Sequence, residues 1–364
     1  MKREVVIVGA GPAGLSAAVE SAQAGAQVLV VDQNDRPGGQ LFKQIHKFFG
    51  SKEHWAGVRG IDIGNRLLDE CREAGVEVWL SSTVIDICDG NTVAVLREQE
   101  LRLELVEAGQ ILLATGGMEN ALNFKGWTLP GVMGAGCAQT MINVNRTLPG
   151  NRVLMVGSGN VGLIVGYQLM QAGAEIVGIV EAAPKIGGYG VHAAKIRRAG
   201  VRFYLSHTII AAEAEQEQVC RAVIAQVDSS WNVVAGTEKT FDVDTICIAA
   251  GLRPQSRLAR LMEIEHVFIP AMGGWMPDHD RNMRTTNRIV YIAGDIAGVE
   301  EANTAMDEGR LAGISMAQAL GYLSGEAEPK KQEIRQRLMA LRLGPFGQLR
   351  QDGKSCMMEK VMLS

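Results

Sequence analysis

The sequence predicts an α/β protein made of two Rossmann-like, three-layer dinucleotide-binding domains, with the second inserted into the first. Three observations support this prediction. The order strand, Gly-rich turn, helix and strand ending in a carboxylate occurs twice, and the two turns begin at Gly9 and Gly157, 148 positions apart. A chain of 364 residues is long enough for two domains of ordinary size. The composition is globular, with 47% apolar residues and 43 glycines that indicate many tight turns.

The composition and charge argue against several other classes of protein. A net charge of −4 does not suit a nucleic-acid partner, which usually requires a basic surplus. The basic start at Met1 and the uncharged run of 22 residues from Val153 to Ala174 imitate membrane signals. Both coincide with a predicted strand, turn and helix, so we expect no membrane span. The six cysteines fit neither a disulfide framework nor a zinc site, which favours reduced thiols in a cytoplasmic protein.

The first copy of the pattern lies at the N-terminus. Residues 4–8 form a short apolar run with β-branched side chains, as expected for a buried parallel strand. An Ala-rich helix is predicted over 15–24, and residues 27–31 form the next strand, with Asp32 at its end. Together they make a βαβ unit of about 30 residues, the size that this motif needs.

The turn of the first copy fits the pattern G-x-G-x-x-G. It consists of Gly9, Ala10, Gly11, Pro12, Ala13 and Gly14. The first glycine permits a tight turn, the second lets the backbone approach a pyrophosphate, and the third lets helix and strand pack closely. The helix N-terminus then faces the phosphate charge. Asp32, 18 positions after Gly14, is expected to accept hydrogen bonds from an adenosine ribose.

The second copy repeats every part of the first. It has a strand at 152–156, a turn at 157–162, a helix at 163–171 and a strand at 175–180. The turn contains Gly157, Ser158, Gly159, Asn160, Val161 and Gly162, and Glu181 follows Gly162 by 19 positions. The same chemistry therefore predicts a second adenine nucleotide.

The carboxylate of Glu181 bears on which nucleotide this second site takes. A carboxylate at the strand end suits a free 2′-hydroxyl and repels a 2′-phosphate, so NADH is favoured over NADPH. Arg197 and Arg198 would suit a 2′-phosphate, but the stretch 193–198 is rich in Ala, Lys and Arg and indicates the solvated face of a helix. ATP or another adenine nucleotide would satisfy the motif equally, and an empty site is a further alternative.

Three more strands and a distinct C-terminal segment complete the prediction. The strands are expected at 110–114, 245–249 and 289–293. Residues 326–364 lean basic and contain a helical stretch near 330–342, and we interpret them as a tail outside the main cores. The apolar positions Ile334, Leu338 and Leu341 suit either a docking surface for a partner or a helix packed on its own domain.

With these motifs placed, the chain resembles the superfamily of FAD/NAD proteins with two dinucleotide-binding domains, which includes thioredoxin reductase. The resemblance rests on the two Gly motifs with Asp32, on Pro37-Gly38-Gly39-Gln40, Ala114-Thr115-Gly116, Ala249-Ala250-Gly251 and Gly294-Asp295. It implies an FAD domain at 1–118 and 250–325, an inserted NAD or adenine-nucleotide domain at 119–249, and the tail at 326–364.

The resemblance also implies which residues contact the cofactors. Asp295 is expected at the flavin ribityl chain, and Gly39 and Gln40 beside the flavin. The FAD site is expected to comprise Gly9, Gly11, Pro12, Ala13, Gly14, Asp32, Gln33, Gly38, Gly39, Gln40, Ala114, Thr115, Gly116, Gly294 and Asp295. The second nucleotide site is expected to comprise Gly157, Gly159, Asn160, Val161, Gly162, Glu181 and Gly251.

One departure from thioredoxin reductases separates the chain from disulfide reduction. Those enzymes carry C-x-x-C before the second Gly motif, whereas this chain has only Cys137 there, which we interpret as a small packed residue. The chain is more similar to the α subunits of heteromeric amino-acid dehydrogenases and oxidases of the proline, opine and sarcosine type. The segments Leu129-Pro130-Gly131-Val132, Ala135-Gly136-Cys137-Ala138-Gln139 and Gly344-Pro345-Phe346-Gly347 carry this similarity.

The narrower similarity implies partner proteins. In that group a second flavoprotein subunit oxidises the amino acid, and some α subunits carry a Cys-rich segment for a [2Fe–2S] cluster. Only Cys356 occurs in this region, so the cluster is expected on a separate small protein. The expected function is hydride exchange between NADH and FAD within a multi-subunit dehydrogenase, in which the chain transfers electrons. The alternatives are a stand-alone NADH:acceptor reductase and a non-catalytic, cofactor-bearing subunit.

No side chain is assigned as a catalytic acid or base, because the cofactors carry this chemistry. The six histidines have no ligand-like spacing. His46 is nearest in sequence to the expected flavin loop, and we interpret it as a loop or packed residue. The catalytic residues and the amino-acid substrate therefore stay unassigned at this level.

Overall fold

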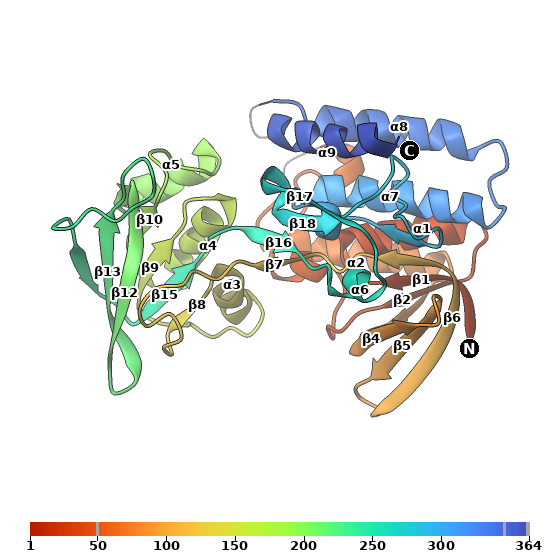
Figure 1. Cartoon of the computed structure of the whole chain (residues 1–364). Helices are drawn as coiled ribbons and strands as arrows, with labels where there is room; N and C mark the ends of the chain where they lie inside the picture. The colour runs from red at the N-terminus through yellow and green to blue at the C-terminus, as the bar shows by residue number, and fades with distance from the viewer. Residues whose placement is uncertain (49–50, 345–346, 362–364) are drawn as a thin grey trace. The chain divides into compact units, whose positions relative to one another are not determined.

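The computed structural model describes residues 1–48, 51–344 and 347–361, with the backbone alone for 356–361. Pro345, Phe346 and the side chain of Cys356, which entered the expectations above, lie outside the described residues. The chain divides into two compact units (Figure 1). Unit 1 comprises Met1–Met118 and Arg253–Ser364, and unit 2 comprises Glu119–Leu252. The two segments that pass between the units pair as short strands, β7 (Gly117–Glu119) and β16 (Leu252–Pro254).

Unit 1 is built on a seven-stranded sheet with the order β3-β2-β1-β6-β5-β4, and β19 pairs with β6. The strands are β1 (Lys2–Val8), β2 (Val28–Val31), β3 (Glu77–Trp79), β4 (Ser82–Cys88), β5 (Thr92–Arg97), β6 (Arg102–Leu113) and β19 (Val290–Ile292). The five strands β3, β2, β1, β6 and β19 run parallel, whereas β4, β5 and β6 form an antiparallel ribbon. Residues 5–8 and 28–31 are almost fully buried, as their apolar runs predict for strands covered on both faces.

The remaining elements of unit 1 are helices and one hairpin. The helices are α1 (Pro12–Gln23), α2 (Gly60–Glu73), α6 (Arg257–Leu261), α7 (Ala302–Ala319), α8 (Ala327–Leu341) and α9 (Gln348–Val361). Short 3-10 turns are η1 (Gly39–Lys43), η2 (Lys52–His54), η3 (Pro270–Met272) and η4 (Asp295–Ala297), and the hairpin is β17 (His266–Ile269) with β18 (Gly274–Pro277). Figure 1 shows α1, α7 and α8 as successive layers on one side of the sheet.

The contact between α1 and α7 is unusually close because small residues face each other. A Cβ added to Gly309 would lie 2.1 Å from the carbonyl oxygen of Ala13, and one added to Gly313 would lie 2.5 Å from that of Ala17. Only glycine permits such an approach of two backbones. Ala13 therefore belongs to the packing of α1 on α7 as well as to the Gly-rich turn.

Unit 2 has three layers. Its central parallel sheet has the order β11-β10-β9-β15-β8. The strands are β8 (Val132–Gly134), β9 (Arg152–Val156), β10 (Glu175–Glu181), β11 (Phe203–Leu205) and β15 (Thr245–Ile248). One face is covered by α3 (Ala135–Asn143), α4 (Asn160–Gln171) and α5 (Gly190–Arg198), and the other by an antiparallel sheet of β12 (His207–Glu215), β13 (Gln218–Gln226) and β14 (Lys239–Asp242). The predicted fold class is confirmed.

The C-terminal segment differs from its prediction. Ala327, Ile334 and Leu338 of α8 are buried in the same apolar cluster as β1 and α1, so the interpretation of residues 326–364 as a tail outside the cores is wrong for this helix. The helix packs on α7. The two interpretations of Ile334 and Leu338 are thereby distinguished, because these side chains contact the chain's own unit.

Candidate functional site

The residues expected to hold the first nucleotide gather at one edge of the parallel sheet of unit 1. They follow the carboxyl ends of β1, β2, β6 and β19 or open the elements that come next. Gly9 and Gly11 follow β1, Asp32 follows β2, Thr115 follows β6, and Asp295 follows β19. Since ligands of open α/β sheets bind outside the carboxyl ends of the strands, this edge is the candidate site. Gln33 and Gln40 are exposed there.

The three motif glycines of this site are required for different reasons. Gly9 has φ +113°, and an added Cβ would lie 2.3 Å from the carbonyl oxygen of Ala114. A Cβ on Gly14 would lie 1.9 Å from the carbonyl oxygen of Gly9. Gly11 has φ −77°, and the nearest atom to an added Cβ is the Cα of Gly39 at 3.9 Å. The protein itself thus requires the first and third glycines, whereas nothing in the described protein requires the second.

The start of α1 presents backbone N–H groups that have no partner within the helix, next to Gly11. No side chain caps this end of the helix, and Pro12 occupies its first turn. Proline at this position removes an N–H that would have no intrahelical partner. The remaining N–H groups and the helix dipole favour an anion at this end.

The carboxylate of Asp32 is hydrogen-bonded to the backbone of the first Gly-rich turn. Its Oδ2 accepts a hydrogen bond from the backbone N–H of Ala10 at 2.6 Å, and its Oδ1 accepts from both the backbone and the side chain of Asn34 at 2.8 Å. The side chain is 7% exposed. A carboxylate offers about four acceptor positions, so it retains capacity for ribose hydroxyls.

The Gly-Gly segment after Asp32 lies against the first turn. The N–H of Gly38 donates to the carbonyl of Ala10 at 2.7 Å. A Cβ added to Gly39 would lie 3.0 Å from the Cα of Gly11, and Gly39 has φ +51°. The segment therefore packs backbone to backbone on the turn, which places η1 at the edge of the candidate site.

Asp295 occupies the opposite part of this edge. Burial, together with the carboxylates of Glu308, Glu301 and Glu300, raises the pKa of Asp295 to about 7. The N–H of Gly294 donates to Oε2 of Glu308 at 3.0 Å. A Cβ added to Gly117, which ends the Thr115-Gly116-Gly117 turn, would lie 3.3 Å from the Cβ of Asp295. The turns after β6 and β19 are thus in direct contact.

The second motif repeats this construction in unit 2. Gly157 has φ +110°, and an added Cβ would lie 2.2 Å from the carbonyl oxygen of Ala249. A Cβ on Gly162 would lie 2.3 Å from the carbonyl oxygen of Gly157, whereas a Cβ on Gly159 would meet no atom within 4 Å. No side chain caps the start of α4 at Asn160. The packing of the described residues therefore again requires the first and third glycines of the motif but not the middle one.

Glu181 holds the second turn as Asp32 holds the first. Its Oε2 accepts from the backbone N–H and the hydroxyl of Ser158 at 2.9 and 2.6 Å, and its Oε1 accepts from the N–H of Ala183 at 2.9 Å. The side-chain oxygen of Asn160 accepts from the N–H of Tyr189 at 2.9 Å. The predicted positions of the acid and of the helix start therefore coincide in space.

A second Gly-Gly pair lies at the second turn and was not among the residues predicted from the sequence. Gly187 and Gly188 follow Glu181 by six and seven positions, the spacing of Gly38 and Gly39 from Asp32. The N–H of Gly188 donates to the carbonyl of Ser158 at 2.8 Å. The repeated offset from the acid was the signal that would have found this pair.

Other predicted positions lie at the margin of the second site. Val161 is 40% exposed on α4, and Gly251, with φ +87°, follows β15 at the end of unit 2. Arg197 and Arg198 are exposed on α5, as expected for a solvated face, and with Lys185 they line a hollow beside Gly188.

Cys137 departs from its prediction. It is exposed on α3, where Ala135, Ala138 and Ile142 face the core, so its interpretation as a packed residue is wrong. Helical periodicity explains the difference, because position 137 falls on the solvent side of a helix whose other small residues are buried. Each of the five cysteines whose side chains are described is a free thiol.

The described part of the chain contains no helix with the length and apolar character that a membrane crossing requires. The uncharged run at 153–174 forms β9, the second Gly-rich turn and α4. Its apolar character therefore comes from core residues of unit 2.

Similar proteins with curated names belong to multi-subunit oxidases and synthases. One of the opine oxidase subunits of Agrobacterium tumefaciens is 27% identical over 88% of this chain and 66% of its own length. A hydrogen cyanide synthase subunit of Pseudomonas aeruginosa is 28% identical over 94% of this chain and 77% of its own. The alpha subunit of sarcosine oxidase from Rhizobium meliloti is 30% identical over 70% of this chain and 25% of its own. The chain thus spans only part of each relative.

Solved structures share the fold at lower identity. Thioredoxin reductase of T. acidophilum superposes with a TM-score of 0.71 at 20% identity, covering 88% of this chain and 99% of that one. L-proline dehydrogenase of P. horikoshii superposes with a TM-score of 0.67 at 21% identity, covering 92% of this chain and 59% of that one. The thioredoxin reductase-like fold inferred from the motifs is confirmed.

The family model of the pyridine nucleotide-disulphide oxidoreductases matches residues 3–309. This range contains the Gly-rich turns, both acids and the Gly294-Asp295 turn. The chain therefore belongs to the pyridine nucleotide-disulphide oxidoreductase family.

Proposed function

We propose that the chain binds FAD at the edge of the unit 1 sheet and NADH at the second Gly-rich turn, as the electron-transfer subunit of a multi-subunit amino-acid dehydrogenase. The observation that carries the proposal is the middle glycine of each motif. Gly11 and Gly159 have negative φ and room for a side chain, yet both are glycine. A ligand whose phosphates lie close to the backbone at these two positions would explain why both are glycine.

In the proposed FAD site each element has one task. The N-terminus of α1 binds the pyrophosphate through backbone N–H groups beside Gly11. Asp32 accepts hydrogen bonds from the adenosine ribose. Asp295 contacts the ribityl chain, and Gly39 and Gln40 lie beside the flavin. Family membership supports FAD as the cofactor of this site.

In the proposed nucleotide site, Glu181 selects NADH. Three of its acceptor positions already serve Ser158 and Ala183. The remaining capacity suits a ribose hydroxyl, whereas the negative charge repels a 2′-phosphate. The N-terminus of α4 takes the pyrophosphate. ATP would occupy the same turn, and the experiment below separates the two ligands.

With both cofactors bound, the chemistry that they would supply is exchange of a hydride between the nicotinamide and the flavin. The residues of the chain bind and orient the cofactors, and none is assigned as an acid or base. The single thiol at Cys137 cannot form the internal disulfide that C-x-x-C enzymes use, so disulfide reduction is not part of the proposal.

The role within a larger complex follows the relatives, which carry the names of oxidase and synthase subunits. We propose that a second flavoprotein oxidises the amino acid and that a separate small [2Fe–2S] protein completes the complex. The free thiols among the described cysteines support a cytoplasmic location.

The test is anaerobic titration of the natively purified protein, followed in the flavin absorption band. One flavin per chain, bleached by NADH more readily than by NADPH, with no inhibition of this bleaching by added ATP, is the expected result. Bound flavin that NADH does not bleach would contradict hydride exchange and leave a non-catalytic role. A colourless protein that does not take up FAD would contradict the whole proposal.

Co-purification tests the role within a complex separately. A tagged chain expressed with its native neighbours is expected to bring down a second flavin-containing polypeptide, detected by native mass spectrometry. Steady NADH oxidation with an artificial acceptor by a chain that purifies alone would instead indicate a stand-alone reductase.

A further inference from the structure

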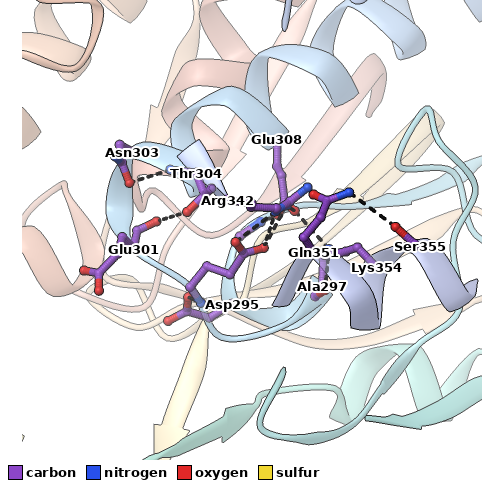
Figure 2. Close-up of polar contacts among 12 residues, drawn as sticks. Asp295, Ala297, Glu301, Asn303, Thr304, Glu308, Arg342, Gln351, Lys354 and Ser355 are labelled. Atoms are coloured by element: carbon purple, nitrogen blue, oxygen red, sulfur yellow. Dashed lines mark hydrogen bonds and ion pairs between the residues drawn. The ribbon is translucent and has the colours of Figure 1, made fainter. Parts of the chain in front are cut away.

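Two cations from the C-terminal segment, Arg342 and Lys354, lie buried in unit 1 near the turn that carries Asp295 (Figure 2). Lys354 of α9 is 1% exposed. Its Nζ donates to the carbonyl of Ala297 at 2.6 Å and lies 2.9 Å from Oε1 of Glu308. It also lies 3.1 Å from Nε2 of His279, whose Nδ1 is 2.8 Å from the carbonyl of Asp280. A fully buried lysine is rare unless it is paired.

Arg342, directly after α8, is the second cation. It is 4% exposed, and its Nη2 donates to Oε1 of Glu300 at 2.7 Å and to Oε1 of Glu308 at 2.8 Å. Its Nε donates to both oxygens of Glu300 at 3.1 and 3.0 Å. Figure 2 shows the side chains of Arg342 and Lys354 meeting at Glu308.

This ion cluster is attached to the backbone of the candidate cofactor turn at three points. Glu308 accepts from the N–H of Gly294 at 3.0 Å, and Lys354 donates to the carbonyl of Ala297. Oδ1 of Asp295 accepts from the N–H of Glu300 at 3.3 Å, and the carboxylate of Glu300 is held by Arg342. The segment 294–300 is thus fixed at its start, middle and end by groups that depend on the two cations.

Stability alone is a weak explanation for this arrangement. Replacing a buried ion pair by well-packed apolar residues is often neutral or stabilising, because desolvation offsets the attraction between the charges. A cluster whose hydrogen bonds end on the backbone of one turn is better suited to defining the conformation of that turn.

We propose that Arg342 and Lys354 are positioning residues that fix the Gly294–Glu300 segment for flavin binding, so that the C-terminal helices control the affinity for FAD. The proposal rests on the proposed function, since it takes the turn at Asp295 as part of the FAD site. Neither cation touches the cofactor, and both act through Glu308, Glu300 and the backbone.

The charges of the cluster make the pH dependence of FAD affinity a test of the proposal, because a purely structural role of the cations would leave that pH dependence unchanged. The groups that face Asp295 are the carboxylates of Glu300, Glu301 and Glu308. Arg342 pairs with Glu300 and Glu308, and Lys354 pairs with Glu308. His279 lies beside Lys354, and burial holds its pKa well below the usual value. The pKa of Asp295 is about 7, raised chiefly by burial. Loss of one cation leaves the carboxylates less compensated, which raises the pKa of Asp295 further. An ionised Asp295 accepts hydrogen bonds from ribityl hydroxyls, so FAD affinity falls as this group becomes protonated.

The test compares Lys354→Met with a matched control, Lys331→Met. Lys331 is 4% exposed on α8, but its Nζ contacts Gln318, Asn282 and Glu328 and no residue of the 294–300 segment. The dissociation constant of FAD is measured by fluorescence quenching of apo protein across a pH series, with the melting temperature of each variant. K354M is expected to weaken FAD binding about tenfold or more and to move the pH midpoint upward. K331M is expected to keep the affinity within about threefold and the midpoint unchanged.

Two further variants keep the proposal open to refutation if K354M does not fold. Lys354→Arg retains the charge and is expected to keep the wild-type pH midpoint. The double variant K354M/E308Q removes one cation and one carboxylate and is expected to recover part of the lost affinity. Equal losses of affinity in K354M and K331M, an unchanged midpoint in K354M, or a shifted midpoint in Lys354→Arg would overturn the proposal. A wild-type protein that binds no FAD would instead contradict the proposed function.

Discussion

Oδ2 of Asp32 accepts a hydrogen bond from the backbone N–H of Ala10 at 2.6 Å, so the acid at the end of β2 holds the Gly-rich turn after β1. In unit 2, Glu181 and Ser158 repeat this relationship at 2.9 Å. The acid of each motif therefore has a structural task before any ribose is bound. Both tasks use the carboxylate as an acceptor for backbone donors, which explains why an amide is a poor substitute.

Asp32→Asn is expected to weaken both the fold and FAD binding. The amide presents an NH₂ group to one of the donors of Ala10 and Asn34, which costs about 1–3 kcal/mol of unfolding free energy. FAD affinity is expected to fall about tenfold or more because a ribose acceptor is lost. Urea unfolding of the apo protein and FAD titration measure the two effects. Asp35→Asn is the control, because Asp35 lies in the same loop, exposed and paired with Arg36. An equal effect of both variants would contradict the role of Asp32.

Gly11→Ala is expected to separate ligand binding from stability. An added Cβ fits the described protein at Gly11, so the melting temperature should change little, whereas FAD affinity should fall about tenfold or more as the methyl meets the pyrophosphate. Gly14→Ala should instead destabilise the apo protein, since its Cβ would lie 1.9 Å from the carbonyl oxygen of Gly9. Calorimetry and FAD titration give the two readouts. Full FAD affinity in G11A would argue against a phosphate at this turn.

Glu181→Gln is expected to change the preference between nicotinamide cofactors. Removal of the negative charge relieves the repulsion of a 2′-phosphate, and Lys185, Arg197 and Arg198 line the neighbouring hollow. The ratio of NADPH to NADH affinity should rise about tenfold, measured by flavin bleaching or by nucleotide titration. Glu175→Gln, at the exposed start of the same strand, is the control. An unchanged ratio would indicate that Glu181 does not face the ribose.

Asp307→Asn is expected to remove an acid-sensitive contribution to stability. Asp307 is fully buried, and its carboxylate accepts from His54 at 3.1 Å, Arg310 at 2.7 Å and Arg337 at 3.0 Å. Burial alone would raise the pKa of Asp307, but these three donors outweigh it and hold the pKa well below its usual range. A lowered folded-state pKa stabilises the protein above the unfolded-state pKa of about 3.9, and the stabilisation is lost as the pH falls through the folded-state pKa.

The measurement for Asp307 is urea unfolding of wild type and variant over a pH series. D307N should lose about 3–5 kcal/mol of unfolding free energy near pH 7, and the difference should shrink below about pH 4. Glu333→Gln, which breaks the exposed pair of Glu333 with Arg337, should cost less than about 1 kcal/mol at every pH. A difference that does not vary with pH would contradict the assignment to the charge of Asp307.

The local pattern of apolar residues was sufficient to predict the strands and helices around each Gly-rich turn. The strand at 152–156 was predicted with its observed bounds, and the helices after both turns begin three residues earlier than their apolar runs suggested. The early starts have one cause. Pro12 and Asn160 open the two helices at the Gly-rich turns, where polar and small residues hide the apolar period that marks the helix interior.

Contacts between segments far apart in the sequence could not be predicted from this local pattern. The exposure of Cys137, the burial of Lys354 and the pairing of His54 with Asp307 depend on which faces of α3, α9 and α7 are covered by other elements. Basic residues in a helix normally indicate a solvated face. For this reason residues 326–364 were predicted to form a tail outside the main cores. Arg342 and Lys354 are exceptions to this rule, because the carboxylates of Glu308 on α7 and of Glu300 just before α7 pair with them in the interior.

The sequence by itself determined the two Gly-rich turns, the acids that follow them and hence the fold class and family, because these depend on residue types at short, fixed spacings along one βαβ unit. The tertiary structure alone decided which glycine of each motif the protein's own packing does not require and which buried cations hold the turn at Asp295. Those properties depend on distances between segments far apart along the chain, which only the packed protein defines.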